Sequence, residues 1–199
     1  MNGHRWGAEG PPLEAYSRVT NPERFAPLHD IAEETLDRLV STFRVKRMEG
    51  CGLDPELEHR YKLARPTVKL LPQEPLAAPV VVAFSVFPGL HVRFGRWYLT
   101  AFPNYGCDAC AETAEGEEER LRSLVGNVTA GCFREAICIP AVGDPWIESE
   151  FWSELRPILR SGRRSQSRID PDHAEQLVAE SGRSSYNWVQ WPKLGPGGD

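Results

Sequence analysis

The residues best suited to chemistry are two cysteines separated by two residues, Cys107 and Cys110, in the segment GCDACAE. A pair at this spacing can act as a thiol–disulfide couple, because the N-terminus of a following helix stabilises a thiolate. It can also supply two of the four ligands of a zinc site. Acidic neighbours at Asp108 and Glu112 raise thiol pKa values and so disfavour the redox interpretation. The third interpretation needs no chemistry, since small cysteines often pack in a protein core.

A zinc site would need further ligands, and the most obvious source is Cys132 and Cys138. On one strand these two thiols would be about 20 Å apart, and on a helix they would lie on different faces, so they cannot act together. The CxxC pair would have to combine with His91, Cys51 or one of these two. We therefore expect no cofactor, with zinc as the alternative. An odd total of five cysteines also predicts reduced thiols and a cytoplasmic protein.

A second group of candidate residues lies on a predicted strand over residues 91–102, which contains two arginines close to aromatic residues. We expect a bulge at Gly95 and Arg96 that keeps the apolar residues Trp97, Leu99 and Ala101 on one inner face. The predicted polar face comprises His91, Arg93, Arg96 and Tyr98. Paired arginines can hold a carboxylate, a phosphate or an acidic partner. The alternative is an ordinary solvated face of an antiparallel sheet.

The elements that must position these residues follow from the periodicity of apolar side chains. Residues 27–43 and 112–130 have the apolar stripe of helices packed on a core. Shorter helices are predicted to begin at Asp144 and at Asp170, and residues 160–168 are predicted to form a loop. The strongest strand pattern is at residues 80–87, which are apolar on both faces, as in a central strand. Further strands are predicted at residues 43–48, 67–71, 133–139 and 185–192.

Grouped strands with helices before and after them predict an α+β fold. We expect a mostly antiparallel sheet of roughly four to six strands packed against two or three amphipathic helices. The chain of 199 residues is expected to hold one domain, residues 13–194, between flexible tails at 1–12 and 195–199.

Two segments are similar to a family of uncharacterised bacterial proteins with a YSRVTxPERFxPLH opening and an FPxxGCDACxE motif. The corresponding segments of this chain are residues 16–25 (YSRVTNPERF) and 102–112 (FPNYGCDACAE). The resemblance implies a bacterial, cytoplasmic, single-domain protein and brings no assigned chemistry with it.

The function predicted from these observations is binding rather than catalysis, because no nucleophile elbow, phosphate loop or metalloprotease motif is present. We expect an immunity- or adaptor-like interaction module that recognises a protein partner or a small anionic ligand. The net charge of −5 disfavours nucleic acid, and no apolar run is long enough to cross a membrane. The alternative is a CxxC-centred zinc-binding or thiol-redox protein.

Overall fold

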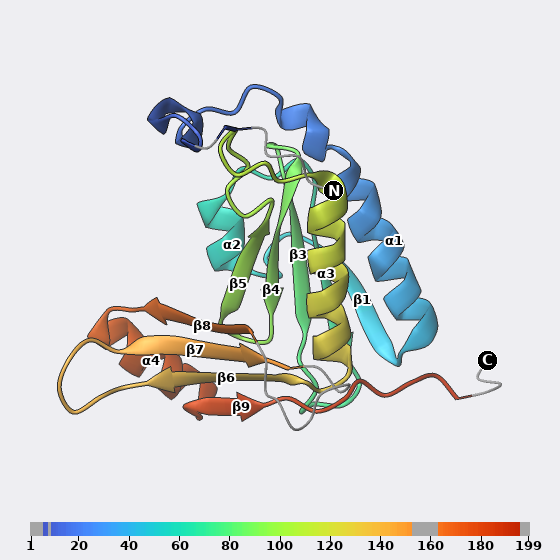
Figure 1. Ribbon diagram of the computed structural model, residues 1–199. Helices are drawn as coiled ribbons and strands as arrows, with labels where there is room; N and C mark the ends of the chain where they lie inside the picture. The colour runs from blue at the N-terminus through green and yellow to red at the C-terminus, as the bar shows by residue number, and fades with distance from the viewer. Residues whose placement is uncertain (1–5, 8, 153–162, 196–199) are drawn as a thin grey trace.

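The computed structural model describes residues 6–7, 9–152 and 163–195, and it contains two antiparallel sheets and four α-helices (Figure 1). The first sheet is a meander in which each strand pairs with the next along the chain. Its strands are β1 (Val45–Gly50), β2 (Thr67–Pro72), β3 (Val80–Ser85), β4 (Gly89–Phe94) and β5 (Tyr98–Phe102). This architecture confirms the predicted α+β fold.

Helices α1 (Pro27–Thr42) and α3 (Ala114–Thr129) pack side by side over one face of the first sheet (Figure 1). Both were predicted, because their apolar residues recur every three or four positions. Pro27 occupies the first turn of α1, where its missing N–H costs no hydrogen bond. The N-cap of α3 is Thr113, whose hydroxyl accepts a hydrogen bond from the Gly116 N–H at 3.2 Å.

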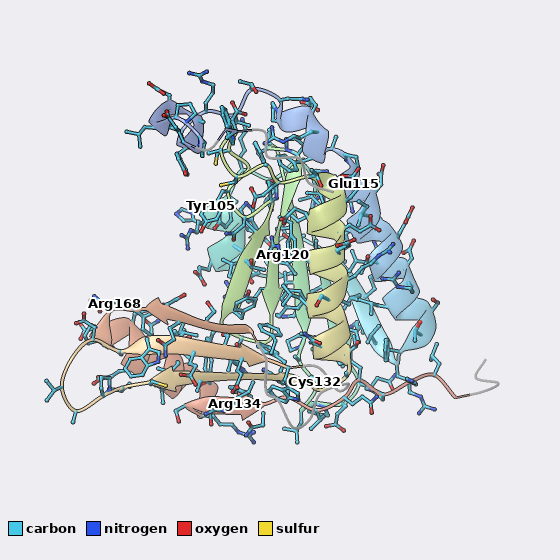
Figure 2. All side chains as sticks on the ribbon, viewed as in Figure 1. Tyr105, Glu115, Arg120, Cys132, Arg134 and Arg168 are labelled. Carbon is cyan, nitrogen blue, oxygen red and sulfur yellow. The ribbon has the colours of Figure 1, made fainter. Side chains whose placement is uncertain are left out.

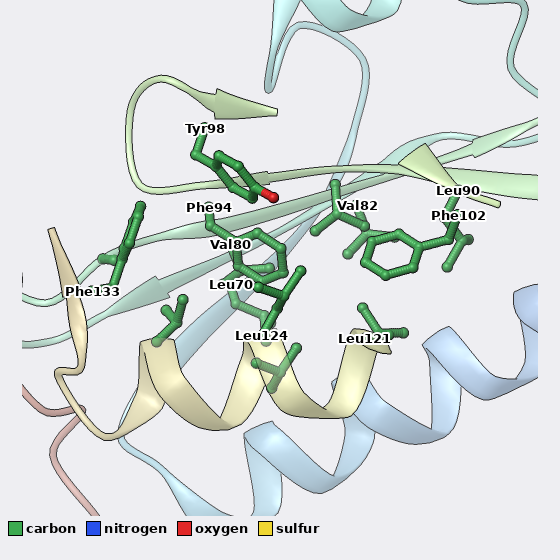
Figure 3. Packing of buried hydrophobic residues seen from close by; sticks show 14 of the residues in the cluster. Leu70, Val80, Val82, Leu90, Phe94, Tyr98, Phe102, Leu121, Leu124 and Phe133 are labelled. Carbon is green, nitrogen blue, oxygen red and sulfur yellow. The ribbon is translucent and has the colours of Figure 1, made fainter. Parts of the chain in front are cut away.

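The core between these helices and the sheet is built from β3 and its neighbours (Figure 3). All six residues of β3 are buried, as the apolar pattern on both faces predicted. Val80, Val82 and Phe94 on the sheet belong to one buried cluster with Leu121 and Leu124 on α3. Each fully buried side chain of this size contributes about 1.5–3 kcal/mol to folding.

The second sheet lies across one end of the first (Figure 1). Its strands run in the order β8 (Arg163–Arg168), β7 (Trp146–Phe151), β6 (Phe133–Cys138) and β9 (Ser185–Asn187), and helix α4 (Pro171–Ser181) follows β8. Aromatic rings join the two sheets: the ring centroids of Tyr98 and Phe94 on the first sheet lie 4.9 and 6.4 Å from that of Phe151 on the second. A single hydrophobic cluster therefore includes residues of both sheets.

Two sequence predictions in this second sheet were wrong. The predicted helix after Asp144 is strand β7, and residues 163–168 of the predicted loop form strand β8. Residues 160–162 lie outside the described part of the chain. The spacing of Ile147 and Phe151 suits a helix, but pairing with β6 and β8 overrides that local preference. The polar sequence of β8 suits the exposed edge of a sheet.

The predicted strand over residues 91–102 is a hairpin, so the predicted bulge was also wrong. The chain reverses at Gly95, whose φ of 68° is a left-handed conformation that favours glycine. The reversal pairs Phe94 with Tyr98 and Arg93 with Leu99. Tyr98 therefore belongs to the core face, where it is 8% exposed, and does not share the face of His91 and Arg93.

None of the helices in the described ranges is long and apolar enough to cross a bilayer.

Candidate ligand-binding cleft

A cavity of about 710 Å³ lies in the corner where the two sheets meet. One wall is formed by β5 and the short helix α2 (Pro55–Arg60), and the other by β7, β8 and α4. Among the lining residues that the structure describes, four are arginines and one is a histidine, against a single carboxylate. The charged lining residues are Glu56, Arg60, Arg93, Arg96, Arg168 and His173.

Arg93 ties helix α2 to the sheet. Its guanidinium contacts the Asp54 carboxylate at 2.5 Å and the Glu56 carboxylate at 2.8 Å, and its side chain is 11% exposed. Asp54 is also the N-cap of α2, because it accepts a hydrogen bond from the Leu57 N–H at 3.1 Å. Burial alone would lower the pKa of Arg93, but the hydrogen bonds and charges of the two carboxylates outweigh it and raise this pKa. Arg93 therefore has a structural role and is already paired.

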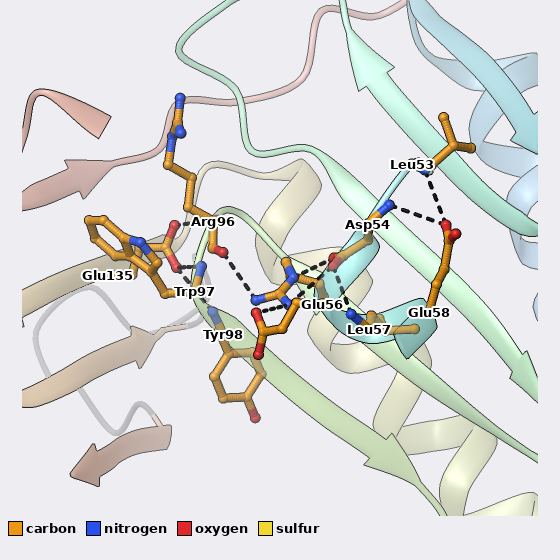
Figure 4. Close-up of polar contacts among 10 residues, drawn as sticks. Leu53, Asp54, Glu56, Leu57, Glu58, Arg96, Trp97, Tyr98 and Glu135 are labelled. Carbon is orange, nitrogen blue, oxygen red and sulfur yellow. Dashed lines mark hydrogen bonds and ion pairs between the residues drawn. The ribbon is translucent and has the colours of Figure 1, made fainter. Parts of the chain in front are cut away.

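The turn that carries Arg96 is held by one buried carboxylate, Glu135 on β6 (Figure 4). Glu135 accepts hydrogen bonds from the backbone N–H groups of Arg96, Trp97 and Tyr98 at 2.7, 2.9 and 3.2 Å. It also accepts one from the Trp188 indole at 3.1 Å. This carboxylate fixes the position of the β4–β5 turn relative to the second sheet.

Burial raises the pKa of Glu135 to about 7, although its four hydrogen-bond donors oppose the increase. Gly95 is required beside it, because a Cβ at that position would collide with Glu135 Oε1. Glu135 was not predicted as a site residue, because its only signal in the sequence is an acidic side chain within the apolar strand pattern at residues 133–139.

Three arginines of the cleft have guanidinium groups that remain available. Arg60 lies over the Tyr61 ring at 5.5 Å and Arg96 over the Tyr186 ring at 5.2 Å, and neither forms an ion pair within the described ranges. Arg168, at the end of β8, is 3.8 Å from a carboxylate oxygen of Asp144, and its side chain is 87% exposed (Figure 2). An exposed pair of this kind is weak.

His91 contributes packing to this region. Its ring stacks on Tyr61 with 3.4 Å between centroids. Burial, followed by the positive charge of Arg60, lowers the pKa of His91 to about 4, so the ring is neutral at neutral pH. Of the predicted polar face, the structure brings Arg93 and Arg96 to the cleft and stacks His91 on Tyr61. Tyr98 is buried on the core face of β5 and also lines the cleft.

Three serines on the second sheet, Ser149, Ser165 and Ser167, also line the cleft. Ser149 pairs with Ser165, and Ser167 pairs with Ile147, so their side chains share one face of the sheet. Within the described part of the chain, none of these hydroxyls forms a hydrogen bond to a histidine or a carboxylate. The cleft thus offers hydroxyl groups to a ligand without an assembled nucleophile and base.

The Cys107 and Cys110 thiols lie outside the cleft, with 3.1 Å between their Sγ atoms. The hydrogen bond to Cys107, burial, and the charges of Cys107 and Glu112 raise the pKa of Cys110 to about 11. This thiol is therefore protonated at neutral pH, which is unfavourable for thiolate chemistry. Among the described residues, no group of three or more histidines, cysteines or carboxylates is placed to hold a metal ion.

The cysteine loop, residues 103–112, packs against residues 13–25, and we call the two segments together the cap. Asp108 accepts hydrogen bonds from the N–H and the hydroxyl of Thr20, both at 3.0 Å. Arg24 donates to the Gly106 carbonyl at 2.9 Å. Glu112 accepts from the N–H groups of residues 104–106 at 2.6–3.3 Å. The two segments that carried the sequence resemblance therefore form one structural unit.

The fold and the cleft define an α+β protein of two antiparallel sheets with a positively lined cavity between them. The chain belongs to a family of unknown function (DUF6226), which matches residues 2–194. No curated protein and no solved structure matches this chain.

Proposed function

We propose that this protein is a binding module, without catalytic activity, that takes an anionic ligand in the cleft between its two sheets. The observation that carries the proposal is the set of three available guanidinium groups, on Arg60, Arg96 and Arg168, around one cavity. Among the described lining residues the one carboxylate, Glu56, is already paired with Arg93. A carboxylate or phosphate in this cavity would therefore find charged donors, and no unpaired carboxylate among these residues would compete with it.

The size and the surroundings of the cleft support this proposal. A volume of about 710 Å³ lies within the range of small-ligand sites, roughly 300–1,000 Å³. The chain as a whole carries a net charge of −5. The positive charge of the cleft arginines is therefore opposite in sign to the charge of the whole chain. The neutral lining groups, including the hydroxyls of Ser149, Ser165 and Ser167, could accept or donate further hydrogen bonds.

The absence of an assembled catalytic pair among the described cleft residues supports binding over catalysis. The CxxC alternative has less support, because the raised pKa of Cys110 disfavours a reactive thiolate. Cys51, Cys107 and Cys110 form no disulfide in the structure, which supports a reducing compartment such as the cytoplasm.

The test uses citrate and pyrophosphate as probes, with binding measured by isothermal titration calorimetry. We expect saturable binding that weakens as salt is raised, because the contacts are ionic. The double variant Arg60→Ala/Arg96→Ala should weaken binding by about tenfold or more, since each charged hydrogen bond contributes about 1.5–3 kcal/mol.

The matched control is Arg38→Ala/Arg122→Ala, which removes the same charge from helices α1 and α3. Those helices cover the face of the first sheet that lies opposite to helix α2 and the cleft (Figure 1). An equal loss of affinity in the control would show that binding depends only on total charge, and the cleft would not be the site.

A further inference from the structure

Strand β5 presents its backbone edge to the cleft. It is the last strand of the first sheet and pairs only with β4 in the described part of the chain. Residues 96–101 all line the cavity without a gap. Side chains of a strand alternate between its two faces, so an unbroken run of lining residues means that the cavity follows the edge.

The backbone groups along this edge have few partners. Leu99, Thr100 and Ala101 are each partly exposed. Apart from its hydrogen bonds to β4, the backbone of β5 forms two hydrogen bonds within the described ranges. The Tyr98 N–H donates to Glu135, and the Ala101 carbonyl accepts from the Arg120 guanidinium. Leu99 and Thr100 have none. The outward N–H and C=O groups of an edge strand are able to pair with another strand.

The other edge strands carry features that discourage pairing, and β5 does not. Strand β1 contains charged residues at Lys46, Arg47 and Glu49, and β8 both begins and ends with arginine. Strand β9 is only three residues long. Strand β5 has the sequence YLTAF, with no charge and no proline. Charges, prolines and short length are the usual means by which proteins protect sheet edges.

We propose that the occupant of the cleft is an extended, acidic segment of another protein that adds to β5 as a sixth strand. This inference rests on the proposed function, because the same arginines that would bind an anion flank the edge. Arg96 lies in the turn two residues before β5, Arg60 ends helix α2, and Arg168 ends β8. Backbone pairing supplies affinity in this mode of recognition, and alternate side chains supply specificity.

A compact anion would account for the arginines but would leave the β5 edge unpaired. A peptide of about five residues, roughly 17 Å long when extended, would match the length of β5 and could satisfy both. A second copy of this chain is a poor donor, because its acidic run at residues 115–119 lies within helix α3. The occupant is therefore a different protein with alternating acidic residues.

The test uses a seven-residue peptide in which glutamate and valine alternate, together with three matched peptides. Two of these are N-methylated, one on every glutamate and the other on every valine, and the third has glutamine in place of glutamate. Successive amides of a strand point to opposite sides, so only one methylated set can face β5 while the carboxylates keep their positions.

We expect one methylated peptide to bind about tenfold or more weakly than the parent, while the other retains affinity, because only one loses hydrogen bonds to the edge. The glutamine peptide should also bind about tenfold more weakly. Within residues 99–101, the amides that point away from β4 should gain protection from hydrogen exchange in the parent complex.

Equal binding by the parent and both methylated peptides would overturn the strand-addition proposal, and so would a lack of protection along β5. Titrations with citrate and pyrophosphate distinguish a failure of strand addition from a failure of anion binding in the cleft. If the small anions occupy the cleft while the peptides behave alike, the cleft binds anions without adding a strand. If neither the small anions nor the peptides bind, both proposals fail.

Discussion

The turn that leads into β5 and the loop that follows β5 are each held by a glutamate side chain, one buried and the other partly exposed. In each, one glutamate accepts hydrogen bonds from three successive backbone N–H groups. Glu112 lies six to eight residues from the amides that it holds and is partly exposed. Glu135 lies 37–39 residues away and is completely buried. The first contact is local, whereas the second joins two sheets.

The two regions also differ in how they use their charges. In the cap, Arg24, Asp108 and Glu112 all form hydrogen bonds to neighbouring backbone groups. In the cleft, Arg60 and Arg96 have only aromatic rings beside them within the described ranges. Charges that are already paired stabilise a structure, and charges that are left available can bind a ligand. The comparison therefore assigns stability to the cap and recognition to the cleft.

The largest predicted effect comes from replacing the buried carboxylate. Glu135→Ala should lower the free energy of unfolding by about 3 kcal/mol or more, because it leaves buried N–H groups without an acceptor. Urea denaturation measures this change, and complete loss of folding would agree with it. The matched control, Glu119→Ala on the exposed side of α3, should change stability by less than about 0.5 kcal/mol. A loss below about 1 kcal/mol at Glu135 would contradict its role.

The pH dependence of stability should contain two opposing contributions. The Glu135 carboxyl has a pKa of about 7 in the folded protein, against an ordinary value of 4.5. Between these two pH values the carboxyl is protonated in the folded protein but ionised in the unfolded chain. Its contribution to the free energy of unfolding falls as pH rises, by at most about 1.4 kcal/mol per pH unit. His91 has a pKa of about 4 when folded and 6.5 ordinarily, so only the unfolded chain is protonated in that window. Its contribution rises with pH.

Single substitutions should separate the two contributions in urea titrations between about pH 5 and about pH 6.5. Relative to the parent, Glu135→Gln should make the slope of stability against pH more positive. His91→Phe, which keeps an aromatic ring beside Tyr61, should make the slope more negative. Unchanged slopes in both variants would show that neither group titrates abnormally.

Substitutions in the cap should affect stability but not binding. Asp108→Asn and Glu112→Ala should each lower the free energy of unfolding by about 1–2 kcal/mol, because backbone N–H groups lose a charged acceptor. Citrate affinity should stay within about twofold of the parent, since these carboxylates do not line the cleft. A loss of affinity comparable to that of Arg60→Ala/Arg96→Ala would remove the distinction between the two regions.

The smallest effect is predicted for the cysteine pair. Cys107→Ser/Cys110→Ser should fold and lose about 1 kcal/mol or less, as expected when a buried thiol becomes a hydroxyl. Purified parent protein should contain only background zinc by elemental analysis. About one zinc per chain, together with unfolding of the double variant, would instead support the structural metal site.

Helices α1, α3 and α4 and the central strand β3 were predictable because each has a local signal. Their apolar periodicity and their caps, such as Asp170 before Pro171, are contained within a few residues of sequence. The same Asp–Pro signal at Asp54 marks helix α2, which the sequence analysis overlooked. Strand β7 was not predictable from local pattern, because its conformation depends on β6 and β8.

The candidate site was only partly predictable for the same reason. Arg93 and Arg96 were identified from their spacing, but a single turn at Gly95 decides which face Tyr98 occupies. Arg60, Arg168 and the three serines come from segments far apart in the chain, and only the packing of one sheet against the other brings them to one cavity. Glu135 is the contact that fixes this packing at the β4–β5 turn.

Anion binding in the cleft can be measured by titrating the isotope-labelled protein with citrate and following the amide chemical shifts. If citrate binds in the cleft, saturable shifts will be confined to the lining segments at residues 96–101 and 165–169, to Arg60 and to Asn104, and the rest of the cap will not shift. Shifts centred on other basic surfaces, or no shifts at the cleft, would show that the cleft is not the anion site.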